Sequence, residues 1–278
     1  MSPSIHWNYD GTLLTARDSA IAALGSVVGE KSAPLHGLDI RDVYSVVDGN
    51  QAMLLYTLKG VLANPLPGAP LGGVGAKYNA LGAERFGFDS DALVDEVITV
   101  DQFGRIAGQV SGSDGLDTIL SPPKGKNVQT TEGYRARVRG NLAALHRNVN
   151  AGRSEGNARM AVEDVIVNDN GVVVANGTKA FMDLVSSKTA GLGAFPEKKF
   201  HDFHVLVDGH FGAVEYVWQG QPSGPYPGVN ETVSGTARMR GFMFFELNGE
   251  GLVTKVIGVY DEAVVGAQLG GKGGYLYP

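Results

Sequence analysis

The sequence predicts an α+β protein in which one structural unit occurs twice in tandem. Three observations support this prediction: matching residues recur about 160 positions apart, each copy has a helical segment followed by strand-rich segments, and glycines interrupt those strands. The 278 residues are 43% hydrophobic and 19% charged, and the 40 glycines are about twice the usual share. Helices segregated on one face of an antiparallel sheet are typical of the α+β class.

The repeat stays in register through turns and strands alike. With a shift of 160 residues, and of 159 after one residue is lost, the copies match at Val47-Asp48-Gly49 and Val207-Asp208-Gly209, Tyr56 and Tyr216, Pro67-Gly68 and Pro227-Gly228, Gly82 and Gly241, Leu93-Val94 and Leu252-Val253, and Gln109 and Gln268. Chance matches do not keep one register over roughly a hundred residues, so we interpret the chain as a duplication.

Each copy is expected to contain one helix and about four long strands. The helix of the first copy covers residues 17–28, with Asp18 or Ser19 as its N-cap, and the helix of the second copy covers 178–187. In the second copy, residues 203–220 form a hairpin at an Asp-Gly turn. A further strand pair, at 232–261, turns at an Asn-Gly step.

The two copies differ where they begin. Residues 133–153 have an amphipathic helical pattern, with Leu142, Leu145 and Val149 on one side, and 157–169 are expected to form a short helix that leads into a strand. The first copy starts directly at a strand and lacks these leading helices. The sequence therefore predicts domains at 1–115 and 133–278, joined by a polar, proline-containing linker at 116–132.

Composition excludes several classes of function. The net charge is −6 and no basic cluster is longer than residues 135–139, so nucleic-acid binding is not expected. The chain has no cysteine, which rules out disulfides, thiolate catalysis and thiolate metal sites. There is no secretory signal pattern at 1–14 and no apolar run long enough to span a bilayer. We expect a soluble, cytoplasmic protein.

The second copy resembles a known family. Residues 134–271 carry the resemblance, through Phe195-Pro196-Glu197 before the first long strand, Gly177 before a helix, and a tail in which Asp261 lies seven residues before Gln268. These features resemble the SnoaL-like polyketide cyclases of the nuclear-transport-factor-2-like superfamily. The first copy has a similar tail, one residue longer, with Asp101 and Gln109.

The resemblance implies a fold and a kind of chemistry. A curved sheet wrapped by helices would form a cone with a deep apolar pocket, and two tandem cone-shaped α+β barrels would pair as a pseudo-dimer through the outer faces of their sheets. The family works without a metal or organic cofactor, and an aspartate near the end of the last strand acts as acid and base. The matching residue is Asp261, with Asp101 in the first copy. The superfamily hosts many reactions and also non-catalytic binders.

Asp261 is therefore the first catalytic candidate. A carboxylate in an apolar pocket can remove a proton from carbon and return it to a carbonyl oxygen. The competing interpretation is structural, because Asp261 precedes a helix-like segment and can be its N-cap.

Asp202 and His204 are further catalytic candidates. Strand alternation predicts that they share one face, with His201 on the other, and a His–Asp pair can serve as acid and base. The stronger alternative is that Asp202 and its counterpart Asp42 are polar residues between the two sheets. Because the ligands would not converge, we expect no metal site.

A set of polar and aromatic residues provides candidate substrate contacts. They are Asn168, Met182, Phe195, Tyr216, Trp218 and Tyr260 in the second copy, and His6 and Trp7 in the first. Each can equally belong to the core, and His6 can be a solvated residue near a terminus. The family often has a histidine where Asn168 stands and an arginine where Glu215 stands, and these departures count against an active cyclase.

Two functions follow as hypotheses. The first is a cofactor-independent enzyme that acts on an apolar carbonyl compound by general acid–base catalysis. The alternative is a non-catalytic binding or scaffold protein, in which the second copy holds an apolar small molecule and the first serves as its partner. The sheet of the first copy that lacks leading helices can pack on a second chain, giving a homo-oligomer, or on the aromatic tail at 273–278.

Overall fold

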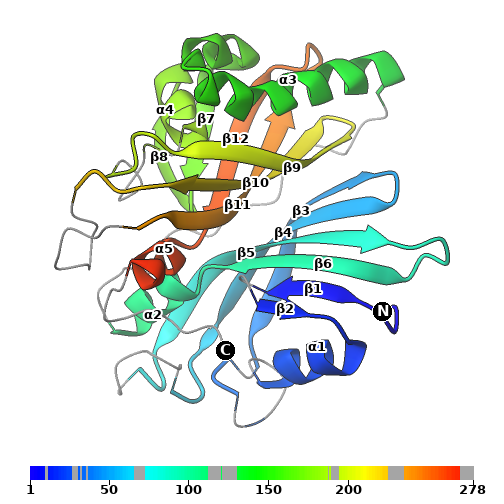
Figure 1. The fold of residues 1–278 in the computed structure, drawn as a ribbon, viewed down its shortest axis with the longest axis vertical. Coiled ribbons are helices and arrows are strands. Elements are labelled where there is room, and N and C mark those ends of the chain that lie inside the picture. Colours follow the sequence, from blue (N-terminus) through cyan, green and yellow to red (C-terminus); the bar gives the residue numbers. More distant parts are fainter. Residues whose placement is uncertain are drawn as a thin grey trace.

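The computed structural model describes residues 1–9, 12–26, 31, 33–35, 37–65, 73–111, 120, 130–186, 188, 194–224 and 235–269. These residues form two halves, each built on a six-stranded sheet (Figure 1). Most of the predicted linker at 116–132, and the whole tail at 273–278, lie outside the described residues. The division into domains at 1–115 and 133–278 therefore stays a prediction.

In its described residues, the first half contains a sheet and two helices. Its elements are β1 (His6–Tyr9), β2 (Thr12–Leu14), α1 (Arg17–Leu24), β3 (Asp39–Asp48), β4 (Gln51–Val61), β5 (Lys77–Phe88), β6 (Val94–Asp101) and α2 (Phe103–Ser111). Helix α1 begins at Arg17, the first residue of the predicted range, and follows Ala16, which makes no side-chain cap. Asp18 and Ser19 therefore lie in the first turn, and the expectation that one of them is the N-cap is wrong.

The second half repeats this arrangement behind two additional helices. Its elements are α3 (Glu132–Asn150), the 3₁₀ helix η2 (Ser154–Met160), β7 (Ala161–Asp169), β8 (Val172–Asn176), α4 (Thr178–Val185), β9 (Lys199–Asp208), β10 (Phe211–Gly220), β11 (Ala237–Leu247), β12 (Val253–Tyr260) and α5 (Glu262–Gln268). The short helix leading into a strand is confirmed as η2 and β7.

The two sheets have the same topology, which confirms the repeat. The strand orders are β2-β1-β6-β5-β4-β3 and β8-β7-β12-β11-β10-β9. In both, the second pair in this order is parallel (β1 with β6, β7 with β12) and the other pairs are antiparallel. The matched turn glycines, Gly49 and Gly209, have φ of 65° and 56°, as the hairpins require.

The matched glutamines show how closely the halves correspond. The side-chain amide of Gln109 accepts from the backbone N–H of Asn79 and donates to its carbonyl, at 2.7 and 2.9 Å. Gln268 makes the same two bonds with Arg238, at 2.7 and 2.8 Å. Each glutamine ties the helix after the last strand to the start of the neighbouring strand. Its recurrence in the sequence therefore has a structural cause.

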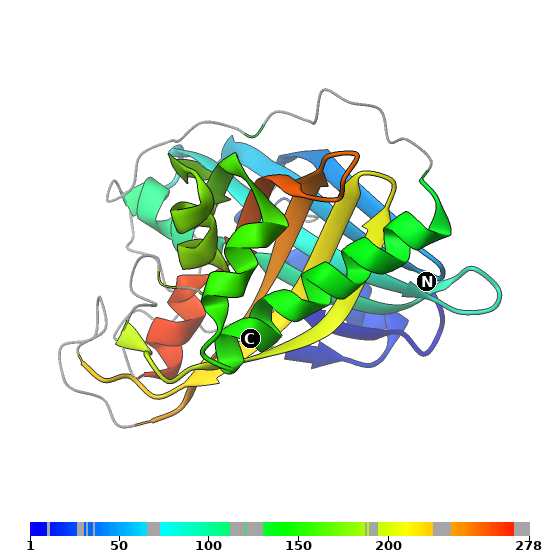
Figure 2. The same cartoon turned by 90° about the horizontal axis from the view of Figure 1, so that it is seen from above.

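Helix α3 distinguishes the halves. It lies across the second sheet (Figure 2) and contributes Val138, Leu142 and Leu145 to the core beneath it. The described residues of the first half include no such helix. Ile40 and Val47 on β3 are consequently 54% and 51% exposed, as expected for a first copy without leading helices.

The outer faces of the two sheets pack against each other. The shared core includes Tyr44, Val46, Leu55, Ala83 and Ile98 from the first half and Leu206, Phe242, Phe244, Ile257 and Val259 from the second. Helices α2 and α5 meet beside this interface, where a Cβ on Gly104 would lie 2.6 Å from Cβ of Ala263. The halves are thus held together largely by apolar side chains from both sheets. Among the described residues, no helix has the length and apolar character needed to cross a membrane.

Candidate functional site

A β-bulge separates the two residues that were expected to share a face. On β9, His204 lies opposite Glu215 of β10, but Asp202 lies opposite Tyr216, so β9 contains one extra residue. A bulge of this kind reverses the alternation of side chains. Asp202 therefore points into the second half, whereas His204 faces the first, and the expectation of a shared face is wrong. The same shift recurs between β3 and β4, where Asp42 lies opposite Tyr56 and Tyr44 opposite Leu55.

Asp202 is paired inside the second half with a histidine that the sequence interpretation missed. Nδ1 of His146, on α3, is hydrogen-bonded to Oδ1 of Asp202. The His146 ring stacks on Phe200 with 4.3 Å between centroids and lies 4.8 Å from the ring of Tyr216. The side chain is 1% exposed, and Nε2 has no hydrogen-bond partner among the described residues. The alternative that Asp202 lies between the sheets is therefore wrong.

The position of His146 follows from how α3 is attached. Thr131 caps the helix by accepting from the N–H of Tyr134. At the other end, the amide of Asn150 donates to the carbonyl of Phe200 at 2.7 Å and accepts from its N–H at 2.8 Å. Because Asn150 is one turn after His146 and Phe200 is two residues before Asp202, this clamp places His146 opposite Asp202. His146 also lies on the apolar stripe of Leu142, Leu145 and Val149, and that is the signal that could have revealed it.

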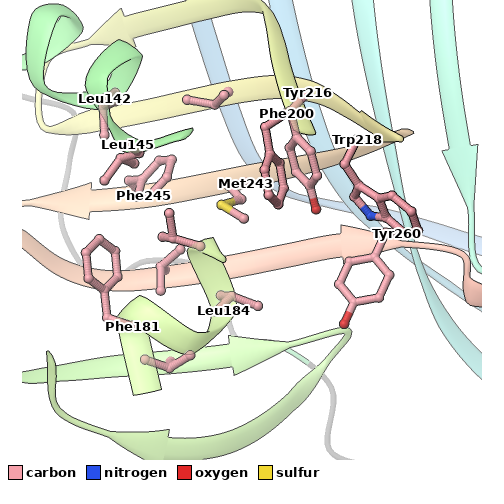
Figure 3. Packing of buried hydrophobic residues seen from close by; sticks show 14 of the residues in the cluster. Leu142, Leu145, Phe181, Leu184, Phe200, Tyr216, Trp218, Met243, Phe245 and Tyr260 are labelled. Atoms are coloured by element: carbon pink, nitrogen blue, oxygen red, sulfur yellow. The ribbon is translucent and has the colours of Figure 1, made fainter. Parts of the chain in front are cut away.

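Aromatic side chains surround this pair. Phe195 and Trp218 are in contact, with ring centroids 4.9 Å apart, and Phe200 and Tyr216 are 5.9 Å apart. The oxygen of Tyr216 and the nitrogen of Trp218 turn toward the interior that they share with Met243 and Tyr260 (Figure 3). Nε1 of Trp218 is buried without a hydrogen-bond partner among the described residues. The interior is thus apolar, with a few polar atoms directed into it.

Several predicted contact residues have identifiable structural roles. Tyr260 donates to Asp169 at 2.8 Å, and Oδ1 of Asn168 accepts from the N–H of Gly171 at 2.9 Å. Asn168 is therefore held in the β7–β8 turn. Phe195, Tyr216 and Trp218 belong to the buried core, and Met182 is half-buried on α4. His6 is exposed, in agreement with the alternative that it is a solvated residue near the terminus.

Asp261 is the N-cap of α5. Its Oδ1 accepts from the N–H of Ala263 and its Oδ2 accepts from the N–H of Gly104 in the first half, both at 3.1 Å. The alternative that Asp261 is a helix N-cap is thus confirmed. Gly82 lies opposite Asp101 and Gly241 opposite Tyr260, so the residue that corresponds to Asp101 is Tyr260. The expectation that Asp101 matches Asp261 is wrong by one position.

The first half contains a polar cluster at its interior face. Tyr56 donates to Asp101 at 2.8 Å, Thr99 donates to Glu84 at 3.2 Å, and Nε1 of Trp7 donates to Thr99 at 2.9 Å. Burial raises the pKa of Glu84 to about 7, and the charge of Asp101 acts in the same direction. Asp42, the counterpart of Asp202, is exposed.

A cavity of about 270 Å³ lies between the halves, whereas the sequence predicted an apolar pocket within the second half. Asn8, Thr99 and Val100 of the first half line it, together with Arg238, Arg240 and Asp261 of the second. The buried apolar side chains inside the second half form one cluster. Within the described ranges, no group of three or more His, Asp or Glu residues is placed to hold a metal ion.

Comparisons with known proteins find likeness only among solved structures. No family model matches the chain, and no curated protein matches it. Similar structures include a candidate SnoaL-like polyketide cyclase from Jannaschia sp. CCS1, with 15% identity over 51% of this chain and 97% of its own and a TM-score of 0.43. A candidate polyketide cyclase from Xanthomonas campestris pv. campestris has 22% identity over 49% and 98%, with a TM-score of 0.42.

A third similar structure is IdmH from Streptomyces antibioticus, a candidate polyketide cyclase, with 15% identity over 48% of this chain and 99% of its own and a TM-score of 0.41. Each of these proteins spans about half of this chain and nearly all of its own length. They are proteins of the kind that residues 134–271 resemble. At these identities no activity carries over.

Proposed function

We propose that the protein is a cofactor-independent enzyme that performs general acid–base chemistry on an apolar carbonyl compound, with His146 and Asp202 as its proton-transfer centre. The supporting observation is a buried histidine whose Nδ1 is bound by a carboxylate while Nε2 has no partner among the described residues. A carboxylate can only accept, so Nδ1 carries the hydrogen and Nε2 presents its lone pair to the interior. A histidine oriented in this way is a common general base.

The proton transfers can be written from the chain's own residues. Nε2 of His146 takes a proton from the carbon beside a carbonyl, and the C–H electron pair becomes the enolate. Asp202 stabilises the imidazolium that forms, because its carboxylate lies against Nδ1–H. The N–H of Trp218, directed into the same interior, can donate to the enolate oxygen. The imidazolium then returns its proton to another carbon or oxygen of the substrate.

A competing centre for the same chemistry lies in the first half. Glu84 is half-buried, and its pKa of about 7 suits a general acid or base at neutral pH. The second half is favoured because its interior is aromatic and its base is oriented by a second group. Both centres are tested in the experiment below.

A non-catalytic function is the second candidate, and the large cluster of buried apolar side chains around His146 and Asp202 favours it. In that case the tandem halves are the covalent equivalent of a dimer and hold an apolar small molecule or a partner without turning it over. His146 and Asp202 would then be a structural pair that fixes α3 on the sheet.

The test uses 5-nitrobenzisoxazole, a neutral aromatic probe of carbon-proton abstraction. A base removes the proton from its ring carbon, the N–O bond breaks, and the released nitrophenolate is followed by its absorbance. We compare the wild-type protein with His146→Gln, Asp202→Asn and Glu84→Gln. His201→Gln is the matched control, because His201 is an exposed histidine on the same strand as Asp202. Thermal unfolding establishes that each variant is folded.

We expect saturable turnover that falls by about 100-fold or more in His146→Gln and by a smaller factor in Asp202→Asn. His201→Gln and Glu84→Gln should retain the wild-type rate. Turnover that disappears in Glu84→Gln and survives in His146→Gln would move the centre to the first half. Turnover no faster than the buffer reaction, with saturable binding of the probe, would support the non-catalytic function instead.

A further inference from the structure

The cavity between the halves has a chemical character distinct from the interior of either half. Its lining comes from both halves, and it combines the guanidinium groups of Arg238 and Arg240 with the apolar side chains of Val100, Val217 and Val264. A volume of about 270 Å³ is just below the range of about 300–1,000 Å³ that is typical of drug-sized ligands. An occupant of this cavity would therefore be small.

The two arginines are placed side by side. Arg240 lies opposite Val217 and Arg238 opposite Gln219 on the same face of β11, so their Cα atoms are about 7 Å apart. Burial lowers the pKa of Arg240, and the positive charges of Arg85 and Arg238 act in the same direction, against the attraction of Glu215. Two guanidinium groups that repel each other at a cavity wall favour an anion between them.

Among the lining residues, the two positive charges of Arg238 and Arg240 exceed the one negative charge of Asp261. Both oxygens of Asp261 accept from backbone N–H groups, of Ala263 and Gly104. Glu215 is bound first to Arg85, at 2.6 Å, and its other oxygen lies 3.5 Å from Nε of Arg240. The guanidinium of Arg238 has no ion-pair partner in the part of the chain that the structure describes. One positive charge is thus available to a ligand.

We infer that the cavity between the halves is a binding site for a small organic carboxylate with an apolar body. The carboxylate lies between Arg238 and Arg240, and the apolar body lies against Val100, Val217 and Val264. The side-chain amides of Asn8 and Gln268 line the same space. Because both halves contribute to the wall, an occupied site ties them together. This site is separate from the His146–Asp202 centre, so either proposal can fail without the other.

The test is a titration with benzoate, monitored through the side-chain amide signals of Asn8 and Gln268 in ¹H–¹⁵N spectra. Benzamide is the neutral probe of the same shape, and inorganic phosphate is the oxyanion without an apolar body. Arg238→Gln and Arg240→Gln remove the charges one at a time. Arg153→Gln is the control, since Arg153 is exposed and outside the cavity lining.

We expect saturable shifts with benzoate, at least tenfold weaker binding of benzamide and phosphate, and at least tenfold weaker benzoate binding in Arg238→Gln. Arg240→Gln should behave likewise. Arg238 is exposed, so its variant tests the inference even where Arg240→Gln fails to fold. No saturable benzoate binding, equal binding by Arg238→Gln, or phosphate binding as tight as benzoate would each overturn it.

Discussion

Arg85 of the first half donates from Nε to the carboxylate of Glu215 in the second, at 2.6 Å, and the two side chains are 2% and 1% exposed. Arg85 also binds Glu96, at 2.9 Å. By the register of the repeat, Arg85 corresponds to Phe244 and Glu215 to Leu55. Those two residues belong to the apolar core between the sheets. The interface is therefore ionic at one position and apolar at the position related by the repeat.

This asymmetry predicts the result of exchanging the residues. Arg85→Phe alone should lower the free energy of unfolding by about 3–5 kcal/mol, because it leaves the buried carboxylate of Glu215 with only the more distant Arg240. Glu215→Leu alone should cost less, because Arg85 keeps its ion pair with Glu96. The double variant should cost less than the sum of the two by more than about 1 kcal/mol, since Glu96 and Arg240 can still reach water. Urea denaturation measures all three. Strictly additive costs would show that the pair is not coupled.

Glu84 predicts a pH dependence of stability. Its pKa is raised from 4.5 to about 7 in the folded protein, so between these values the folded state holds a proton that the unfolded state has released. Stability should therefore fall as pH rises from about 4.5 to about 7 and should not recover above that. Because the group is only half-buried, we expect a loss on the order of 1–2 kcal/mol.

Glu84→Met is the variant for this measurement, because Met243 occupies the corresponding position in the second half. Its melting temperature should exceed that of the wild type by more at pH 8 than at pH 4.5. Glu163→Gln is the control variant. It also removes one negative charge, but at an exposed glutamate outside the polar cluster that contains Glu84. An equal effect of Glu84→Met at both pH values would show that the pKa of the Glu84 carboxyl is not raised.

Two matched glycines predict a steric effect. A Cβ on Gly241 would lie 2.5 Å from the hydroxyl oxygen of Tyr216, and a Cβ on Gly82 would lie 2.2 Å from the ring of Tyr56. Gly241→Ala and Gly82→Ala should each destabilise by about 1–3 kcal/mol. Gly140→Ala should stabilise by about 0.5–1 kcal/mol, because this residue lies inside α3 with open space around it. Thermal unfolding distinguishes these outcomes, and a neutral Gly241→Ala would contradict the close packing of Tyr216.

Repeat matching predicted much of the fold because both halves obey the same local rules. The turn glycines Gly49 and Gly209 and the glutamines Gln109 and Gln268 recur for structural reasons that each half must satisfy. Only the N-cap of α1 was misassigned, since the helix follows Ala16, which makes no side-chain cap.

The site was harder to predict because one bulge changed its geometry. Simple alternation places Asp202 with His204, and only the extra residue on β9 sends them to opposite faces. Glu215, which counted as a departure from the family, faces Arg85 in the other half and not the interior. His146 was overlooked because a single histidine on an apolar helical stripe resembles core until its partner across the sheet is known.

The most direct test of the central claim is the protonation of the His146 ring, measured by long-range ¹H–¹⁵N correlation NMR above the pH at which histidines are charged. The signal is assigned by its loss in His146→Gln. We predict that Nδ1 carries the hydrogen and Nε2 is unprotonated, and that Asp202→Asn alters the Nδ1 signal. A hydrogen on Nε2 in the wild-type protein would contradict a base directed into the interior of the second half.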